Sequence, residues 1–239
     1  MDVVYVATPH AQHRQIVLAA LNAGKHVLCE KAFTINGREA SELVALARER
    51  KLFLMEAVWS RFLPGMQRAF EIAASGELGD VHWVTADLGF PAPYSSTSRL
   101  WARQDGGGAL LDISVYPLLW AVGTLGFPQT VSATGCINDD GVDAQNALTL
   151  GYNHGAQAQL TSSLLAYGPR TATVAGSMGY LQSVSSLNNP RELVIGIGRE
   201  GLRTETFDVV GIGYADELRE VNRCLQRDPP EGPAMLRRD

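Results

Sequence analysis

Two pairs of residues in this sequence combine types and spacing that suit proton chemistry. Glu30 and Lys31 directly follow a short apolar run, and Asp112 and Tyr116 lie four positions apart behind three consecutive glycines. A partly buried lysine can polarise a hydroxyl or carbonyl oxygen. If the second segment is helical, its carboxylate and phenol share one face, where the carboxylate orients a hydroxyl and the phenol exchanges a proton.

Each pair also has an ordinary structural interpretation, and the residues alone leave both open. Glu30 and Lys31 can form a surface ion pair between neighbours. Asp112 can lie near the positive end of a helix, with Tyr116 in the core. Pro117 disfavours α-helical geometry at Tyr116, so we expect a kink or a new helix start at that point.

Aromatic and basic residues near position 60 form a third candidate group. Trp59 and Arg61 follow an apolar run at a predicted domain junction, where small-molecule sites concentrate. They can wall a cleft by stacking and by binding oxygen anions, or Trp59 can fill the core of a hinge. Trp101 follows a turn-rich stretch and can act as a lid. His13 is expected to cap or pack rather than to catalyse.

The elements that must position Glu30 and Lys31 alternate between strand and helix. Short apolar runs predict strands buried on both faces, and amphipathic stretches between them predict helices. Such alternation indicates right-handed parallel units of a doubly wound sheet, whose carboxyl edge is where ligands bind. The predicted strands are Val3–Ala7, His26–Cys29 and Leu52–Met55, and the predicted helices are His13–Ala23 and Ile35–Arg50.

The pattern changes near Arg61, where alternating β-branched segments with short turns begin to dominate. We therefore predict an α/β protein: a partial Rossmann half-domain over 1–60, followed over 61–239 by an α+β domain with a large, open, mostly antiparallel sheet. The glycines of 196–201 are interpreted as a hairpin turn rather than a phosphate loop. Predicted helices are Met66–Ser75, Leu110–Leu125 and Ala215–Gln226; predicted strands are Val131–Asn138, Ala144–Tyr152, Ala156–Leu164, Thr171–Ala175, Glu192–Ile197 and Thr204–Val209.

Composition narrows the possible partners. The 239 residues carry a formal net charge of −5, which offers no basic surplus for nucleic acid or an anionic membrane surface. The three cysteines show no spacing that suits zinc, so we expect free thiols in a reducing compartment and no metal site. Apolar runs are too short for a membrane span, and residues 1–10 do not resemble a signal peptide. These features predict a cytoplasmic protein.

Four motifs in order give the chain a specific resemblance. They are Thr8-Pro9 with His13; residues 23–31 (AGKHVLCEK); residues 55–64 (MEAVWSRFLP); and residues 106–113 (GGGALLDI) followed by Tyr116. This set resembles the glucose–fructose oxidoreductase / inositol dehydrogenase / MocA family, nearest its dimeric dihydrodiol dehydrogenase branch. The resemblance implies an NAD(P)-dependent oxidoreductase with a Rossmann domain and a C-terminal α/β domain. Its small-molecule substrate would be a sugar, a polyol or a cyclic trans-diol.

The resemblance also implies roles for individual residues. Lys31 would be the catalytic lysine, bound to the reacting oxygen and the nicotinamide ribose, and Tyr116 the general acid/base. A lysine ammonium beside that phenol is expected to lower its pKa from about 10 toward neutrality. Substrate would meet Asp112, Tyr116 and Trp101. The cofactor, NADP in preference to NAD, would meet Thr8, Pro9, His13, Glu30, Lys31, Trp59 and Arg61.

Departures from the family pattern lead to an alternative to the enzymatic function. Ala32 stands where the family's Glu-Lys-Pro motif has proline. The glycine-rich half of the Rossmann domain and the residue that selects the cofactor are missing, so the chain is expected to be N-terminally truncated. We also expect it to lack the final helix that returns to the nucleotide domain. The enzyme would form a homodimer through the second domain's sheet; the alternative is a non-catalytic, dimerising α+β module without cofactor binding.

Overall fold

The protein was analysed as a computed structural model that describes residues 2–199 and 201–226. Its N-terminal part is a parallel sheet in the order β1-β2-β3, as predicted from the alternating pattern. Apolar side chains on both faces of these short strands explain their burial. The strands are β1 (Val3–Val6), β2 (His26–Glu30) and β3 (Leu54–Ala57), connected by α1 (His10–Asn22) and α2 (Gly37–Glu49).

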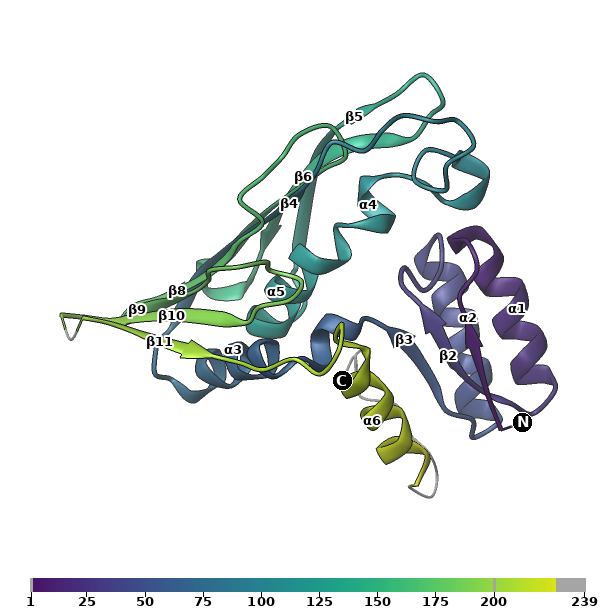
Figure 1. The fold of residues 1–239 in the computed structure, drawn as a ribbon, viewed down its shortest axis with the longest axis horizontal. Coiled ribbons are helices and arrows are strands. Elements are labelled where there is room, and N and C mark those ends of the chain that lie inside the picture. The colour runs from purple at the N-terminus through teal and green to yellow at the C-terminus, as the bar shows by residue number, and fades with distance from the viewer. Residues whose placement is uncertain (1, 200, 227–239) are drawn as a thin grey trace.

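The two faces of the parallel sheet are covered by different parts of the chain. Helices α1 and α2 pack on one face, around the buried Val27 and Leu43. On the other face, Val221 and Cys224 of α6 (Tyr214–Leu225) pack against Leu28 and neighbouring apolar side chains. Figure 1 shows α6 across the sheet from α1 and α2. The expectation that no final helix returns to the nucleotide-binding part is therefore wrong, because the apolar face of this sheet needs a cover.

The larger sheet has the strand order β11-β10-β9-β8-β4-β7-β6-β5. Its neighbours are antiparallel except for the parallel pair β4 and β7, so the predicted mostly antiparallel sheet is confirmed. The strands are β4 (Val81–Gly89), β5 (Thr130–Ile137), β6 (Asp143–Gly151), β7 (Gln157–Ser163), β8 (Ala172–Gly176), β9 (Gly179–Ser183), β10 (Glu192–Ile197) and β11 (Leu202–Thr206).

Two of these strands, β4 and β9, are not among those predicted from the sequence. Strand β4 contains Asp87 and ends in Gly89, and β9 is a five-residue strand that begins with Gly179. Both break the β-branched pattern that marks the other strands. The hairpin predicted at 196–201 is confirmed, because β10 and β11 pair antiparallel across it.

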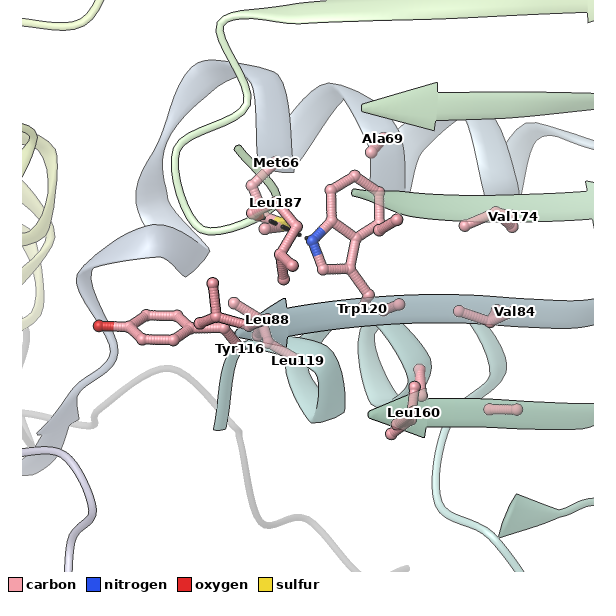
Figure 2. Close-up of a cluster of buried hydrophobic side chains, with 14 of the residues drawn as sticks. Met66, Ala69, Val84, Leu88, Tyr116, Leu119, Trp120, Leu160, Val174 and Leu187 are labelled. Carbon is pink, nitrogen blue, oxygen red and sulfur yellow. Dashed lines mark hydrogen bonds between the residues drawn. The ribbon is translucent and has the colours of Figure 1, made fainter. Parts of the chain in front are cut away.

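The main core lies between the large sheet and the helices α3 (Pro64–Ser75) and α5 (Val115–Leu125). Trp120 is fully buried there, and its indole N–H donates to the Leu187 carbonyl oxygen at 2.8 Å. Figure 2 shows this cluster, with Tyr116 at its edge and the phenol oxygen pointing away from Trp120. The core thus fixes the backbone of α5 while the Tyr116 hydroxyl lies toward the parallel sheet.

The segment predicted as one helix over Leu110–Leu125 is two helices. Helix α4 (Ala109–Asp112) ends before α5 begins, and Pro117 lies in the first turn of α5. Proline has no N–H to continue the α-helical hydrogen-bond series, and this explains the break. Among the described residues no single helix is long and apolar enough to cross a membrane; residues 103–112 and α5 reach that length only as a pair bent by 47°.

Candidate active site

The site forms where the carboxyl edge of the parallel sheet meets α4 and α5 (Figure 1). Lys31 follows β2, and its ammonium donates to the Asp112 backbone oxygen at 2.5 Å and to Asp112 Oδ1 at 3.3 Å. Arg99 Nη1 donates to the same Oδ1 at 2.6 Å. Asp112 is only 4% exposed, so one buried carboxylate holds two cations from distant parts of the chain.

The two cations set the protonation of Asp112. Burial by itself would raise the pKa of this carboxyl, but the charges of Lys31 and Arg99 outweigh that effect and hold its pKa below the usual range. Asp112 is therefore a carboxylate at neutral pH. It fixes the Lys31 ammonium at the end of α4.

Tyr116 lies next to this pair but is not hydrogen-bonded to it. The Lys31 ammonium lies 5.3 Å from the centroid of the Tyr116 ring, and the phenol oxygen accepts a hydrogen bond from Trp59 Nε1 at 3.2 Å. Burial raises the pKa of Tyr116 to about 12; the Trp59 hydrogen bond opposes this shift, while the charges of Asp112 and Glu30 add to it.

The expected lowering of the Tyr116 pKa by lysine is therefore not found in this structure. The reason is the direction of the ammonium, which is engaged with Asp112 and faces the Tyr116 ring rather than its hydroxyl. Tyr116 is thus a neutral phenol at physiological pH.

Lys31, Arg99 and Tyr116 border a pocket of about 400 Å³, whereas the predicted site residue Asp112 lies behind Lys31 and does not line it. Five of the sequence-predicted site residues line it, namely Thr8, Pro9, Glu30, Lys31 and Tyr116. Five further lining residues lie outside the predicted set, namely Ala7, His10, Arg99, Asp105 and Tyr214. Arg99 belongs to the turn-rich stretch before Trp101, and Asp105 ends the short 3₁₀ helix that follows it, η2 (Arg103–Asp105). Nothing in the sequence pattern near Tyr214 indicates that α6 returns to this pocket.

Predicted residues that do not line the pocket support it from behind. His13 is fully buried; its Nε2 lies 2.8 Å from the Thr8 carbonyl oxygen, and its Nδ1 lies 2.9 Å from that of Ala32. It joins the segments that follow β1 and β2. Trp59 packs between Tyr116 and Tyr214. The ring centroids of Trp59 and Tyr214 lie 5.6 Å apart, and the Trp59 indole N–H donates to the Tyr116 hydroxyl.

Arg61 and Trp101 lie away from the pocket. Arg61 is in the short 3₁₀ helix η1 (Trp59–Phe62), where burial lowers its pKa and Glu220 of α6 opposes that shift. Trp101 is 3% exposed, and its indole N–H donates to the Pro93 carbonyl oxygen at 3.1 Å. Its large apolar ring is part of the main core rather than a lid over the pocket.

The loop that carries Lys31 is tied to β3. The Phe33 amide donates to Glu56 Oε1 at 2.9 Å. Burial raises the pKa of Glu56, partly offset by the Phe33 hydrogen bond and the Lys31 charge. The peptide bond between Lys31 and Ala32 is cis.

The pocket residues fit the nicotinamide–ribose end of a dinucleotide. Thr8 lies at the carboxyl edge of the parallel sheet, where nucleotides bind in such folds. Its buried Oγ1 has no hydrogen-bond partner among the described residues. A ribose hydroxyl satisfies such a group, and Lys31 offers a second donor beside it. The turns after β1 and β2 lack a G-x-G-x-x-G sequence, so they do not supply the usual pyrophosphate cradle.

Comparisons with known proteins agree with this geometry. A family model described as "Oxidoreductase family, NAD-binding Rossmann fold" matches residues 1–58, and the "GFO/IDH/MocA C-terminal domain" model matches residues 66–182. Trans-1,2-dihydrobenzene-1,2-diol dehydrogenase of Mus musculus is 35% identical over 242 residues, which cover 98% of this chain and 72% of that protein. The Homo sapiens protein of that name is 34% identical over 247 residues, with the same coverage.

Solved structures show the same fold. Aldose-aldose oxidoreductase from Caulobacter crescentus superposes with a TM-score of 0.84 at 25% identity, covering 94% of this chain and 69% of that one. The 3-ketoreductase KijD10 from Actinomadura kijaniata, solved with NADP and TDP-benzene, superposes with a TM-score of 0.81 at 27% identity, covering 98% and 73%. The chain therefore belongs to the Gfo/Idh/MocA family of NAD-binding oxidoreductases.

Proposed function

We propose that this chain transfers a hydride between a nicotinamide cofactor and a CH–OH carbon of a sugar, a polyol or a cyclic trans-diol. The observation that carries the proposal is the convergence of Lys31, Asp112 and Tyr116 beside one pocket at the carboxyl edge of a parallel sheet. The relatives named for trans-diol oxidation support the substrate class.

Cofactor binding is assigned to the residues that follow β1 and β2. Thr8, Pro9, Glu30 and Lys31 would hold the nicotinamide–ribose end. We propose NADP as the preferred form, because KijD10 was solved with it. When bound, the cofactor supplies the carbon that accepts or releases the hydride.

The protein's own residues manage the proton. In reduction, the Tyr116 phenol gives its proton to the carbonyl oxygen while the hydride forms the new C–H bond. In oxidation, the Tyr116 phenolate takes the hydroxyl proton as the hydride leaves and the C=O bond forms. Lys31 binds the reacting oxygen, and Asp112 holds Lys31 and orients the substrate hydroxyl. With a pKa of about 12, Tyr116 is protonated near neutral pH and is therefore in the form that reduction requires.

Turnover tests the proposal. Carbonyl reduction with NADPH and trans-diol oxidation with NADP are measured for the chain and for Tyr116→Phe, with Tyr167→Phe as the control, because Tyr167 is exposed and does not line the pocket. We expect Tyr116→Phe to lose about 100-fold or more in rate, the usual contribution of a general acid. Turnover that survives in Tyr116→Phe would refute the assignment of the proton. No turnover and no cofactor binding would favour the non-catalytic module.

We further propose a homodimer through the open face of the large sheet. Trp83, Ala175 and Tyr180 stand directly opposite one another across β4, β8 and β9, so their side chains share one face, and the row continues to Leu202 of β11. Trp83, Tyr180 and Leu202 are 41%, 38% and 68% exposed. An apolar row of this kind on an uncovered face is typical of a protein interface.

Light scattering tests the dimer. Trp83→Lys places a charge in the row, and we expect it to shift the chain toward monomer. Tyr167→Lys is the control, because Tyr167 is 83% exposed outside the row. An unchanged molar mass in Trp83→Lys would exclude this face.

A further inference from the structure

Glu217 is a buried carboxyl group for which the proposed chemistry has no use. It lies in the first turn of α6 and is 2% exposed. Its Oε1 has no hydrogen-bond partner among the described residues. A carboxylate in such surroundings is costly unless it is paired or protonated.

Among the described residues, the titratable groups that act on Glu217 carry no positive charge. They are Glu30 on β2, Tyr5 on β1 and Tyr214 on its own helix. The described cations nearby act elsewhere: the Lys31 ammonium binds Asp112, and Arg61 of η1 acts on Glu220. The charged group that acts on Glu217 is therefore a second carboxyl group, that of Glu30, and no described cation pairs with Glu217.

Hydrogen bonds distinguish the two carboxyl groups. Glu30 Oε1 accepts from the Tyr5 hydroxyl at 2.5 Å, and Glu30 Oε2 accepts from the Lys31 amide at 3.2 Å. Glu217 Oε1 accepts from no group among the described residues. A buried carboxyl group that lacks a donor is stabilised in its neutral form, so Glu217 keeps its proton.

We propose that Glu217, in its protonated form, is a positioning residue that seats α6 against Glu30 and thereby holds Tyr214 in the wall of the cofactor pocket. The helix connects two parts of the site. Glu217 is buried on the helix that packs on the parallel sheet, while Tyr214 of the same helix lines the pocket and packs against Trp59, which in turn donates to Tyr116. Ionisation of Glu217 sets two negative charges against each other and unseats this wall.

The proton equilibrium of Glu217 agrees with this role. Burial, followed by the charge of Glu30, raises its pKa to about 8. A carboxyl whose pKa is higher in the folded than in the unfolded state favours folding below its unfolded pKa, and that stability is lost as the pH rises through the folded value. The stability that protonated Glu217 contributes is therefore lost between about pH 4.5 and about pH 8.

Chemical unfolding measures how much protonated Glu217 stabilises the packing of α6, and it needs no cofactor. Glu217→Gln keeps the shape of the protonated side chain and cannot ionise. Relative to the wild type, we expect its folding equilibrium constant to rise at least ~10-fold between about pH 5.5 and pH 8. Glu220→Gln is the matched control on the same helix, because Glu220 is paired with Arg223, and it is expected to show no such rise.

A second measurement does not need a variant of Glu217. Infrared spectroscopy detects the C=O stretch of a protonated carboxyl group, which we expect at pH 6.5 and not at pH 9, both in the wild type and in Glu56→Gln, where the buried Glu56 cannot contribute to the band. The proposal is wrong if the folding equilibrium constant of Glu217→Gln has the same pH dependence as that of the wild type. It is also wrong if no protonated carboxyl group is found at pH 6.5. If Glu217→Gln fails to fold, the infrared measurement alone decides.

The consequence for cofactor binding rests on the proposed function. We expect the NADPH Kd of the wild type to weaken up to ~10-fold for each pH unit above 8, and that of Glu217→Gln to lack this change. Failure of NADPH to bind at any pH would overturn the proposed function and leave the unfolding result standing. If NADPH binds normally but the folding equilibrium constants of the wild type and Glu217→Gln do not diverge with pH, only the role of Glu217 is overturned.

Discussion

The ammonium of Lys31 lies 3.3 Å from the carboxylate of Asp112, although 81 positions separate the two residues along the chain. This ion pair joins the carboxyl end of β2 to the end of α4. Both side chains are largely buried, with 13% and 6% exposed. The pair therefore connects the part of the chain that would hold a cofactor to the part that would hold a substrate.

Removing the charge of Asp112 tests this connection. In Asp112→Asn, Lys31 and Arg99 lose their shared carboxylate, and a buried lysine is left uncompensated. We expect a loss of about 3 kcal/mol in the free energy of unfolding at pH 7, since breaking a buried pair costs this much. Asp105→Asn, at the pocket but without this pair, is the control in urea unfolding.

The pH dependence of the same variant has a definite sign. The Asp112 pKa is lower in the folded state, so its contribution is present above the unfolded pKa of about 4 and disappears as the pH falls below it. The difference between wild type and Asp112→Asn should shrink under acid conditions. A difference that is constant from neutral to acid pH would show that charge is not involved.

The high pKa of Tyr116 predicts opposite pH profiles for the two directions of reaction. Oxidation needs the phenolate, so its rate should rise about 10-fold per pH unit without a plateau below pH 10; reduction needs the phenol and should stay flat. Initial rates in both directions from pH 6 to 10 check this. An oxidation plateau near neutrality would mean that Lys31 turns to the Tyr116 hydroxyl when ligands bind.

Gly108 is required at the start of the helix that carries Asp112. Its φ is +120°, and a Cβ there would lie 2.1 Å from Asp143 Oδ1. The other carboxylate oxygen of Asp143 accepts the Leu110 amide in the first turn of α4, at 2.8 Å. We expect Gly108→Ala to cost more than about 2 kcal/mol of unfolding free energy.

Gly76→Ala provides the comparison for Gly108→Ala. Gly76 also has a positive φ, of +80°, but nothing lies within 4 Å of its missing Cβ. It should cost only the backbone penalty of about 1–2 kcal/mol. Equal melting temperatures for the two variants would contradict the proposed steric requirement at Gly108.

The sequence predicts those parts of the fold that depend on patterns within a short stretch of neighbouring residues. Apolar runs and glycine punctuation locate β1, β2 and β3, and the alternation after residue 130 locates most of the large sheet, because these patterns follow the two-residue repeat and the ends of the strands. The motif resemblance singles out Lys31, Asp112 and Tyr116, and the structure places these three residues beside one another.

What the sequence did not predict depends on contacts between distant segments. The approach of Tyr214 requires α6 to cross back to the parallel sheet, and the burial of Trp101 depends on how the loop after β4 folds. The direction of the Lys31 ammonium, and with it the pKa of Tyr116, is set by Asp112 and Arg99 in three dimensions. No spacing rule contains that information.

Lys31 is proposed to form part of a nicotinamide-binding site, and the proposed reaction depends on this role. Fluorescence titration of the chain with NADPH and with NADH tests it most directly, with Lys31→Ala as the variant and Lys25→Ala as the control. We predict micromolar binding, tighter for NADPH, that weakens at least ~10-fold in Lys31→Ala and is unchanged in Lys25→Ala. No binding at millimolar cofactor, or equal binding by Lys31→Ala, would contradict the account.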